Sequence, residues 1–114
     1  MSAEDFISKA SKTIQKRSEV KEVDIEQEYC KHAKKRNCIA LKLVYLFKKG
    51  FPDRTTLCPG GRILFIEFKR KNKSSSPLQI KCRKLLESFG FEYHVCDEQG
   101  QAEKILDKFL AKCE

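Results

Sequence analysis

The residues best suited to chemistry gather in one apolar segment, ILFIEFK, residues 63–69. Side chains alternate across a strand, so Phe65, Glu67 and Lys69 would share one face. Both faces begin apolar, which is typical of a central strand covered on both sides. Glu67 and Lys69 should therefore emerge together at the rim of a buried strand, where charges are costly to desolvate. By itself the segment fits a catalytic pair and a structural ion pair equally well.

Asp53 favours the catalytic interpretation, although alone it could be a turn residue after proline. It begins a short segment that a P-G-G turn connects to residues 62–69, which predicts an antiparallel hairpin. The start of one arm then lies beside the end of the other, so Asp53 should lie close to Glu67 and Lys69. Two carboxylates offer the oxygen ligands that suit Mg²⁺ or Mn²⁺. Such an ion lowers the pKa of a water and stabilises charge on a phosphodiester, while Lys69 could orient the nucleophile or offset phosphate charge.

Two more polar residues can be interpreted as part of a site or as scaffold. Glu26 shares a predicted helical stripe with apolar or small residues, namely Val23, Cys30 and Ala33. An acid on such a stripe needs a partner, such as a metal cluster, unless its side chain reaches solvent from the first helical turn. Gln79 belongs to S-P-L-Q, which fits a helix capping box with Ser76 as N-cap. That structural role would be sufficient to explain Gln79.

The surrounding pattern predicts the elements that position these residues. We expect helices over residues 3–17, 23–36, 77–90 and 101–112, and strands over residues 39–44, 54–58, 62–69 and 91–96. This order predicts an α/β fold in which a mixed central sheet is flanked by helices. The last strand follows a helical crossover, so it should pair in parallel with a neighbour. The 114 residues fit one domain, with an N-terminal helix and linker over 1–22 and a core over 23–114.

The charge balance points to a polyanionic partner. The chain has 24 Lys and Arg against 16 Asp and Glu, a net charge of +8. Nucleic acid is the commonest partner of such a chain, although a solvated surface would have the same composition. The run KRKNKSSS, residues 69–76, reads as a basic flexible loop directly after the acidic strand.

The cysteines indicate an intracellular protein with free thiols. They are widely spread and lack the paired spacing of a zinc site: Cys30, Cys38, Cys58, Cys82, Cys96 and Cys113. The N-terminus lacks the apolar stretch of a signal peptide, and no segment approaches the length of a membrane span. We therefore expect a cytoplasmic protein with no membrane contact.

Four motifs, in this order and spacing, resemble the VRR-NUC domain, the virus-type replication and repair nuclease branch of the PD-(D/E)XK superfamily. They are G-x-P-D-R at 50–54, P-G-G-R at 59–62, F-I-E-F-K at 65–69 and S-P-L-Q at 76–79. The resemblance covers roughly residues 24–97, and it departs from the family pattern at Phe51, where a smaller aliphatic residue is usual.

The resemblance implies a restriction-endonuclease-like core and roles for individual residues. Asp53 and Glu67 would be metal ligands and Lys69 the catalytic lysine. Glu26 would be the family's helix acid, and Gln79 the polar residue that follows the E-x-K motif. Lys42 also matches a family lysine. Apart from the resemblance, the charges that directly follow the acidic strand predict that Arg70, Lys71 and Lys73 contact the DNA backbone, and we expect Lys42 and Arg54 to contact DNA as well.

The resemblance also implies an activity and partners. We expect hydrolysis of phosphodiester bonds in DNA with Mg²⁺ or Mn²⁺ and no small-molecule cofactor. Single-domain members resemble phage-encoded Holliday junction resolvases that act as homodimers on branched DNA, so the setting would be the host-cell cytoplasm. The N-terminal helix would be a dimer element, or it would pack on its own domain.

Three alternatives remain: a non-catalytic nucleic-acid-binding module, a zinc protein that uses cysteines with His32 or His94, and a nuclease for flap or linear DNA. A pure binding module has no need of clustered acids, which repel phosphate. The cysteine spacing disfavours the zinc protein.

Overall fold

A computed structural model of the chain describes residues 22–43 and 50–112. In chain order its elements are α2 (Glu22–Lys35), β1 (Ile39–Leu41), β2 (Arg54–Cys58), β3 (Arg62–Phe68), α3 (Pro77–Ser88), β4 (Glu92–Cys96) and α4 (Gln101–Ala111). These elements confirm the order expected from the sequence over this part of the chain. The helix expected over residues 3–17, the last residue of the strand expected over 39–44, and Cys113 lie outside the described residues.

The strands form one mixed sheet in the order β1-β2-β3-β4. β2 pairs with both β1 and β3 in antiparallel orientation, while β3 and β4 run parallel. The chain passes through α3 between β3 and β4, which is the connection that parallel neighbours require. The expected α/β fold with a mixed central sheet is thus confirmed, and β3 lies inside the sheet with a partner on each side.

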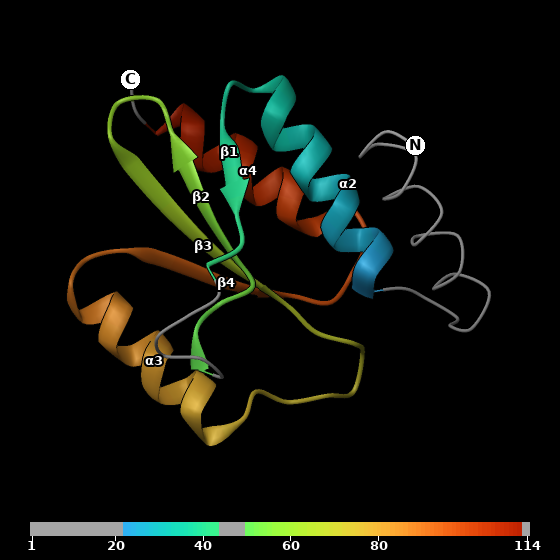
Figure 1. Cartoon of the computed structure of the whole chain (residues 1–114), viewed down its shortest axis with the longest axis vertical. Helices are drawn as coiled ribbons and strands as arrows, with labels where there is room; N and C mark the ends of the chain where they lie inside the picture. The colour runs from blue at the N-terminus through green and yellow to red at the C-terminus, as the bar shows by residue number, and fades with distance from the viewer. Residues whose placement is uncertain (1–21, 44–49, 113–114) are drawn as a thin grey trace, which may run out of the picture.

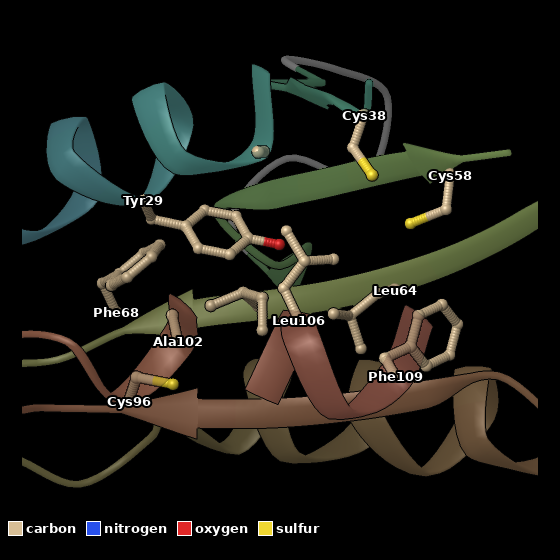
Figure 2. Close-up of a cluster of buried hydrophobic side chains, with 11 residues drawn as sticks. Tyr29, Cys38, Cys58, Leu64, Phe68, Cys96, Ala102, Leu106 and Phe109 are labelled. Carbon is tan, nitrogen blue, oxygen red and sulfur yellow. The ribbon is translucent and has the colours of Figure 1, made fainter. Parts of the chain in front are cut away.

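Helices cover both faces of the sheet. α2 and α4 lie together on one face, and α3 lies on the other (Figure 1). The larger core fills the space between α2, α4 and the sheet, and Leu64 and Phe68 enter it from β3 (Figure 2). Ile66 of the same strand belongs to this core as well. Phe65 faces α3 and belongs to a smaller cluster with Leu86. β3 is therefore apolar on both faces because both are covered.

The buried stripe of α2 differs from the one expected. Tyr29 and Ala33 are fully buried, whereas Val23 is 39% exposed. Tyr29 reaches the sheet (Figure 2), and its hydroxyl lies 2.6 Å from that of Thr56. A large aromatic ring buries more area than a valine, and this hydroxyl finds a partner in the core. Burial of the Tyr29 ring and the hydrogen bond of its hydroxyl together determine which side of α2 faces the sheet.

The β2–β3 hairpin is anchored at its turn. Gly60 and Gly61 have φ angles of 84° and 75°, a conformation that glycine adopts without steric cost. The next residue, Arg62, donates from Nη1 to the carbonyl of Phe109 at 2.6 Å and lies 4.7 Å from the centre of that ring. Its guanidinium satisfies a carbonyl at the C-terminal end of α4. The turn is thereby fixed, and the open end of the hairpin holds Asp53 and Glu67.

Within residues 22–43 and 50–112, none of the helices combines the length and apolar character that crossing a membrane requires.

Candidate active site

Asp53 and Glu67 meet at the open end of the hairpin. Arg54 pairs with Ile66 in the antiparallel register, so the residue before β2 lies beside the residue after Ile66. Asp53 Oδ2 accepts a hydrogen bond of 2.7 Å from the backbone N–H of Phe68, the amide that directly follows Glu67. Asp53 and Glu67 therefore lie close together, as the hairpin pattern predicted. The Asp53 carboxylate also continues the hydrogen bonding of the ladder beyond the last strand pair.

Glu67 is more deeply placed than expected. Glu67 is only 1% exposed, so it lies in the interior of the protein and not at a solvent-exposed rim. Burying a carboxylate requires hydrogen-bond donors, and two are present. The Tyr93 hydroxyl donates to Oε1 at 2.5 Å and the Ser75 hydroxyl to Oε2 at 3.0 Å. Lys69 adds a positive charge, with Nζ 3.6 Å from Oε2.

The Tyr93 hydroxyl keeps its proton. Burial, the hydrogen bond to Glu67 and the charge of that carboxylate all raise the pKa of Tyr93. The charge of Asp53 acts in the same direction, so Tyr93 lies within the field of both acids. The phenol is therefore a permanent donor to Glu67 at neutral pH.

Lys69 and Gln79 join the strand to the following helix. Lys69 Nζ donates to Gln79 Oε1 at 2.6 Å. The same oxygen accepts from the backbone N–H of Ser76, and the Ser76 hydroxyl accepts from the Gln79 N–H, which completes a capping box at the start of α3. The expected cap is confirmed. Gln79 also contacts the expected catalytic lysine.

Glu26 lies in a different arrangement. Its Oε2 accepts a 2.6 Å hydrogen bond from Arg54 Nε, and Arg54 also donates to the carbonyl of Ala40. Across the described ranges, no three or more His, Cys, Asp and Glu side chains are grouped so as to hold a metal ion. The structure therefore does not gather Glu26 with Asp53 and Glu67, and its role as a third ligand stays a prediction. A zinc site finds no support there either.

The residues expected to contact DNA differ in exposure. Lys42, Arg70, Lys71 and Lys73 are exposed, and the last three lie on the segment that connects β3 to α3. Arg54 is the exception, because its side chain is only 19% exposed and is paired with Glu26. Its contacts within the chain explain it as a structural residue that joins β2 to α2.

Sequence reasoning missed Tyr93 and Ser75. Both reach Glu67 from outside the hairpin, Tyr93 from β4 and Ser75 from the basic segment. The register that places Glu67 beside Val95 results from the packing of a crossover. Local residue patterns do not specify that register. The weak signal available was that Tyr93 lies two residues from both Phe91 and Val95, which places a hydroxyl on an otherwise apolar face of a strand expected to pair in parallel with a neighbour.

Comparisons with known proteins identify a curated relative and a solved structure that resemble the chain. No protein-family model matches the chain. A curated relative, "Putative nuclease p44" of Acyrthosiphon pisum secondary endosymbiont phage 1, is 31% identical over 80 residues, which cover 70% of this chain and 86% of the relative. A solved structure described as a VRR_NUC domain superposes with a TM-score of 0.70 at 22% identity, covering 77% of this chain and 96% of its own. The chain therefore belongs to the same family as this phage-encoded putative nuclease, and its fold is that of a VRR_NUC domain.

Proposed function

We propose that this nuclease is a divalent-metal-dependent DNA endonuclease, with Asp53 and Glu67 as metal ligands and Lys69 as the catalytic lysine. The observation that supports this most directly is the convergence of the three side chains at one end of the hairpin. Asp53 is bonded to the amide after Glu67, and Lys69 Nζ lies 3.6 Å from the Glu67 carboxylate.

The donor set fits Mg²⁺ or Mn²⁺. Two carboxylates supply hard oxygen ligands, and Mg²⁺ keeps several waters when one or two carboxylates hold it. In the described part of the chain no larger cluster of His, Cys, Asp and Glu is available, which suits such an open coordination shell better than a closed zinc site. A bound ion of this kind would supply positive charge at the phosphate and a water of lowered pKa.

The chain's own residues would orient the reaction. Lys69 has three N–H donors. One is directed to Gln79 Oε1 at 2.6 Å, and Glu67 Oε2 lies 3.6 Å away. A remaining donor can hold a phosphate oxygen or the attacking water in position. Because Gln79 is fixed in the capping box, the ammonium group starts from a defined position, which reduces the ordering needed for the reaction.

We further propose that the substrate is branched DNA, such as a four-way junction, and that the enzyme is a homodimer. The net charge of +8 and the exposed lysines between β3 and α3 favour a DNA backbone as ligand. Resolving a junction takes two cuts related by a two-fold axis, whereas one chain carries one Asp53–Glu67–Lys69 site. A two-fold dimer supplies the second site in the required symmetry.

The test is cleavage of a panel of linear, nicked, flap, fork and four-way DNAs with Mg²⁺, Mn²⁺ or excess EDTA. We expect cleavage with either ion, none in EDTA, and the four-way junction to be cut first when substrates compete. Full activity in EDTA would overturn the metal proposal. Preference for linear or flap DNA would overturn only the junction proposal.

A further inference from the structure

The two oxygens of the Glu67 carboxylate have different surroundings. Oε1 receives the Tyr93 hydroxyl at 2.5 Å, a short and buried hydrogen bond. Oε2 accepts a hydrogen bond from the half-buried Ser75 hydroxyl at 3.0 Å, and Lys69 Nζ lies 3.6 Å from it. Tyr93 itself is 3% exposed, and its ring packs beside Phe65 on the α3 side of the sheet. The hydrogen-bond partner of Oε1 is therefore held by the core of the protein. The partners of Oε2 belong to the segment that follows β3.

We propose that Tyr93 is a positioning residue that reserves Oε1 of Glu67, so that the carboxylate offers a metal ion Oε2 alone and the site prefers Mg²⁺ or Mn²⁺ over Ca²⁺. The inference rests on the proposed function, in which Glu67 is a metal ligand. Tyr93 would act through Glu67 and would touch neither metal nor DNA.

The preference follows from how the ions bind carboxylates. Ca²⁺ takes six to eight oxygens and accepts a carboxylate through both, whereas Mg²⁺ requires a near-octahedral shell that one carboxylate oxygen suits. A cation that used both oxygens would have to approach the proton that Tyr93 directs at Oε1. Hydrogen bonds to ligating side chains also fix their orientation, and losing one typically weakens metal binding by about 10- to 100-fold.

The molecule offers a matched control in its other described tyrosine. Tyr29 is fully buried, and its hydroxyl also makes a short bond, 2.6 Å to Thr56. It lies in the core on the opposite face of the sheet. Tyr29→Phe thus removes the same atom from a comparable environment away from Glu67. Any general loss of stability should appear in both variants, and a change in metal preference only in Tyr93→Phe.

The experiment measures metal binding without DNA, using the full-length chain. Mn²⁺ affinity is read from the electron paramagnetic resonance of free Mn²⁺, and Ca²⁺ affinity from displacement of bound Mn²⁺. In Tyr93→Phe we expect Mn²⁺ affinity to fall by about tenfold or more, with a smaller loss for Ca²⁺. Tyr29→Phe should keep the wild-type ratio of the two affinities. Unchanged affinities in Tyr93→Phe, or equal losses for both ions, would overturn the proposal.

Asp53→Asn separates this inference from the proposed function. If that variant binds Mn²⁺ as the wild type does, or if the wild type binds none, the metal site is wrong and both proposals fail. If Asp53→Asn loses binding while Tyr93→Phe does not, only the Tyr93 inference fails. Should Tyr93→Phe not fold, the wild type still gives an answer by NMR. The low-field hydroxyl proton of Tyr93 should persist when Mg²⁺ is added, and its disappearance would show that Oε1 has been taken.

Discussion

The side-chain oxygen of Gln79 accepts hydrogen bonds from both Lys69 Nζ, at 2.6 Å, and the backbone N–H of Ser76, at 2.9 Å. One atom therefore completes the cap of α3 and fixes the ammonium group of the proposed catalytic lysine. The structural and functional interpretations of Gln79 do not compete, because the cap holds the oxygen where Lys69 can reach it.

The two roles of Gln79 can be separated with Ser76→Ala and Gln79→Ala. Each removes part of the cap, so each should cost about 1 kcal/mol and lower the melting temperature by roughly 4 °C. Only Gln79→Ala frees Lys69, and we expect its single-turnover rate to fall roughly a hundredfold, with the Ser76→Ala rate close to wild type. Equal rates in the two variants would show that Gln79 acts only as a cap.

The proposed catalytic residues should be tested with isosteric changes. Glu67 is 1% exposed and accepts from Tyr93, so alanine there would leave a cavity and a donor without an acceptor. Glu67→Gln and Asp53→Asn keep an acceptor oxygen, and Lys69→Met keeps the side-chain stem. We expect each to lower cleavage by at least about 10²- to 10³-fold with wild-type circular dichroism. Retained activity in Glu67→Gln would contradict the proposed mechanism.

The basic segment after β3 should bind the DNA backbone. Replacing Arg70, Lys71 and Lys73 with Ala should weaken binding to all DNAs alike. The slope of the logarithm of affinity against the logarithm of salt concentration should become shallower by roughly 2 to 3, because each lost phosphate contact removes about 0.9. Fluorescence anisotropy at several salt concentrations measures both.

The control for that variant replaces three lysines in the last turns of α2 and α4, namely Lys34, Lys35 and Lys108. It removes the same charge from other surfaces. If both triple variants change the slope equally, a long-range field is responsible and direct contact is not.

Stability should fall in alkali because of Cys96. Burial, with the charges of Asp97 and Glu103, raises the pKa of this thiol from 9.0 to about 12. The pKa of the Cys96 thiol is therefore higher in the folded protein than in the unfolded chain. The contribution of this thiol to the free energy of unfolding is complete below pH 9.0 and is lost as the pH rises toward about 12. Urea unfolding between pH 7 and about pH 10.5 should show this loss, with a shallower fall in Cys96→Ala. Parallel curves for the two proteins would contradict it.

The homodimer is tested by light scattering at micromolar concentration. We expect twice the chain mass for the full sequence, and monomers that cut junctions poorly once residues 1–17 are removed. If that segment forms the expected helix, Phe6, Ile7, Ala10 and Ile14 would make an apolar stripe, which association with a second chain would bury. A monomeric full-length protein would remove the resolvase proposal and leave the nuclease family assignment intact.

The parts of the site that could be predicted from the sequence are those that depend on interactions between residues close together in the chain. The hairpin that joins Asp53 to Glu67 could be predicted because turn residues and alternation are local signals. The Ser76–Gln79 cap was predictable for the same reason. Tyr93 was not predicted, because its partner lies on another strand and the register depends on packing.

The arrangement of α2 shows the same limit. Glu26 was expected on a stripe with apolar neighbours, and it was correctly expected to need a partner. That partner proved to be Arg54 on β2, which had been expected to contact DNA. Which of several basic residues reaches a half-buried acid depends on the distance between helix and sheet, and sequence spacing does not report that distance.

The hairpin also bears on the order in which the site assembles. Asp53 bonds an amide 15 residues away across a tight turn, whereas Tyr93 reaches Glu67 over 26 residues and a helical crossover. Closing the shorter loop costs less chain entropy, so we expect the two acids to become neighbours early in folding. β4 then joins and orients a pair that already exists. Local opening of β4 would loosen Glu67 without separating it from Asp53.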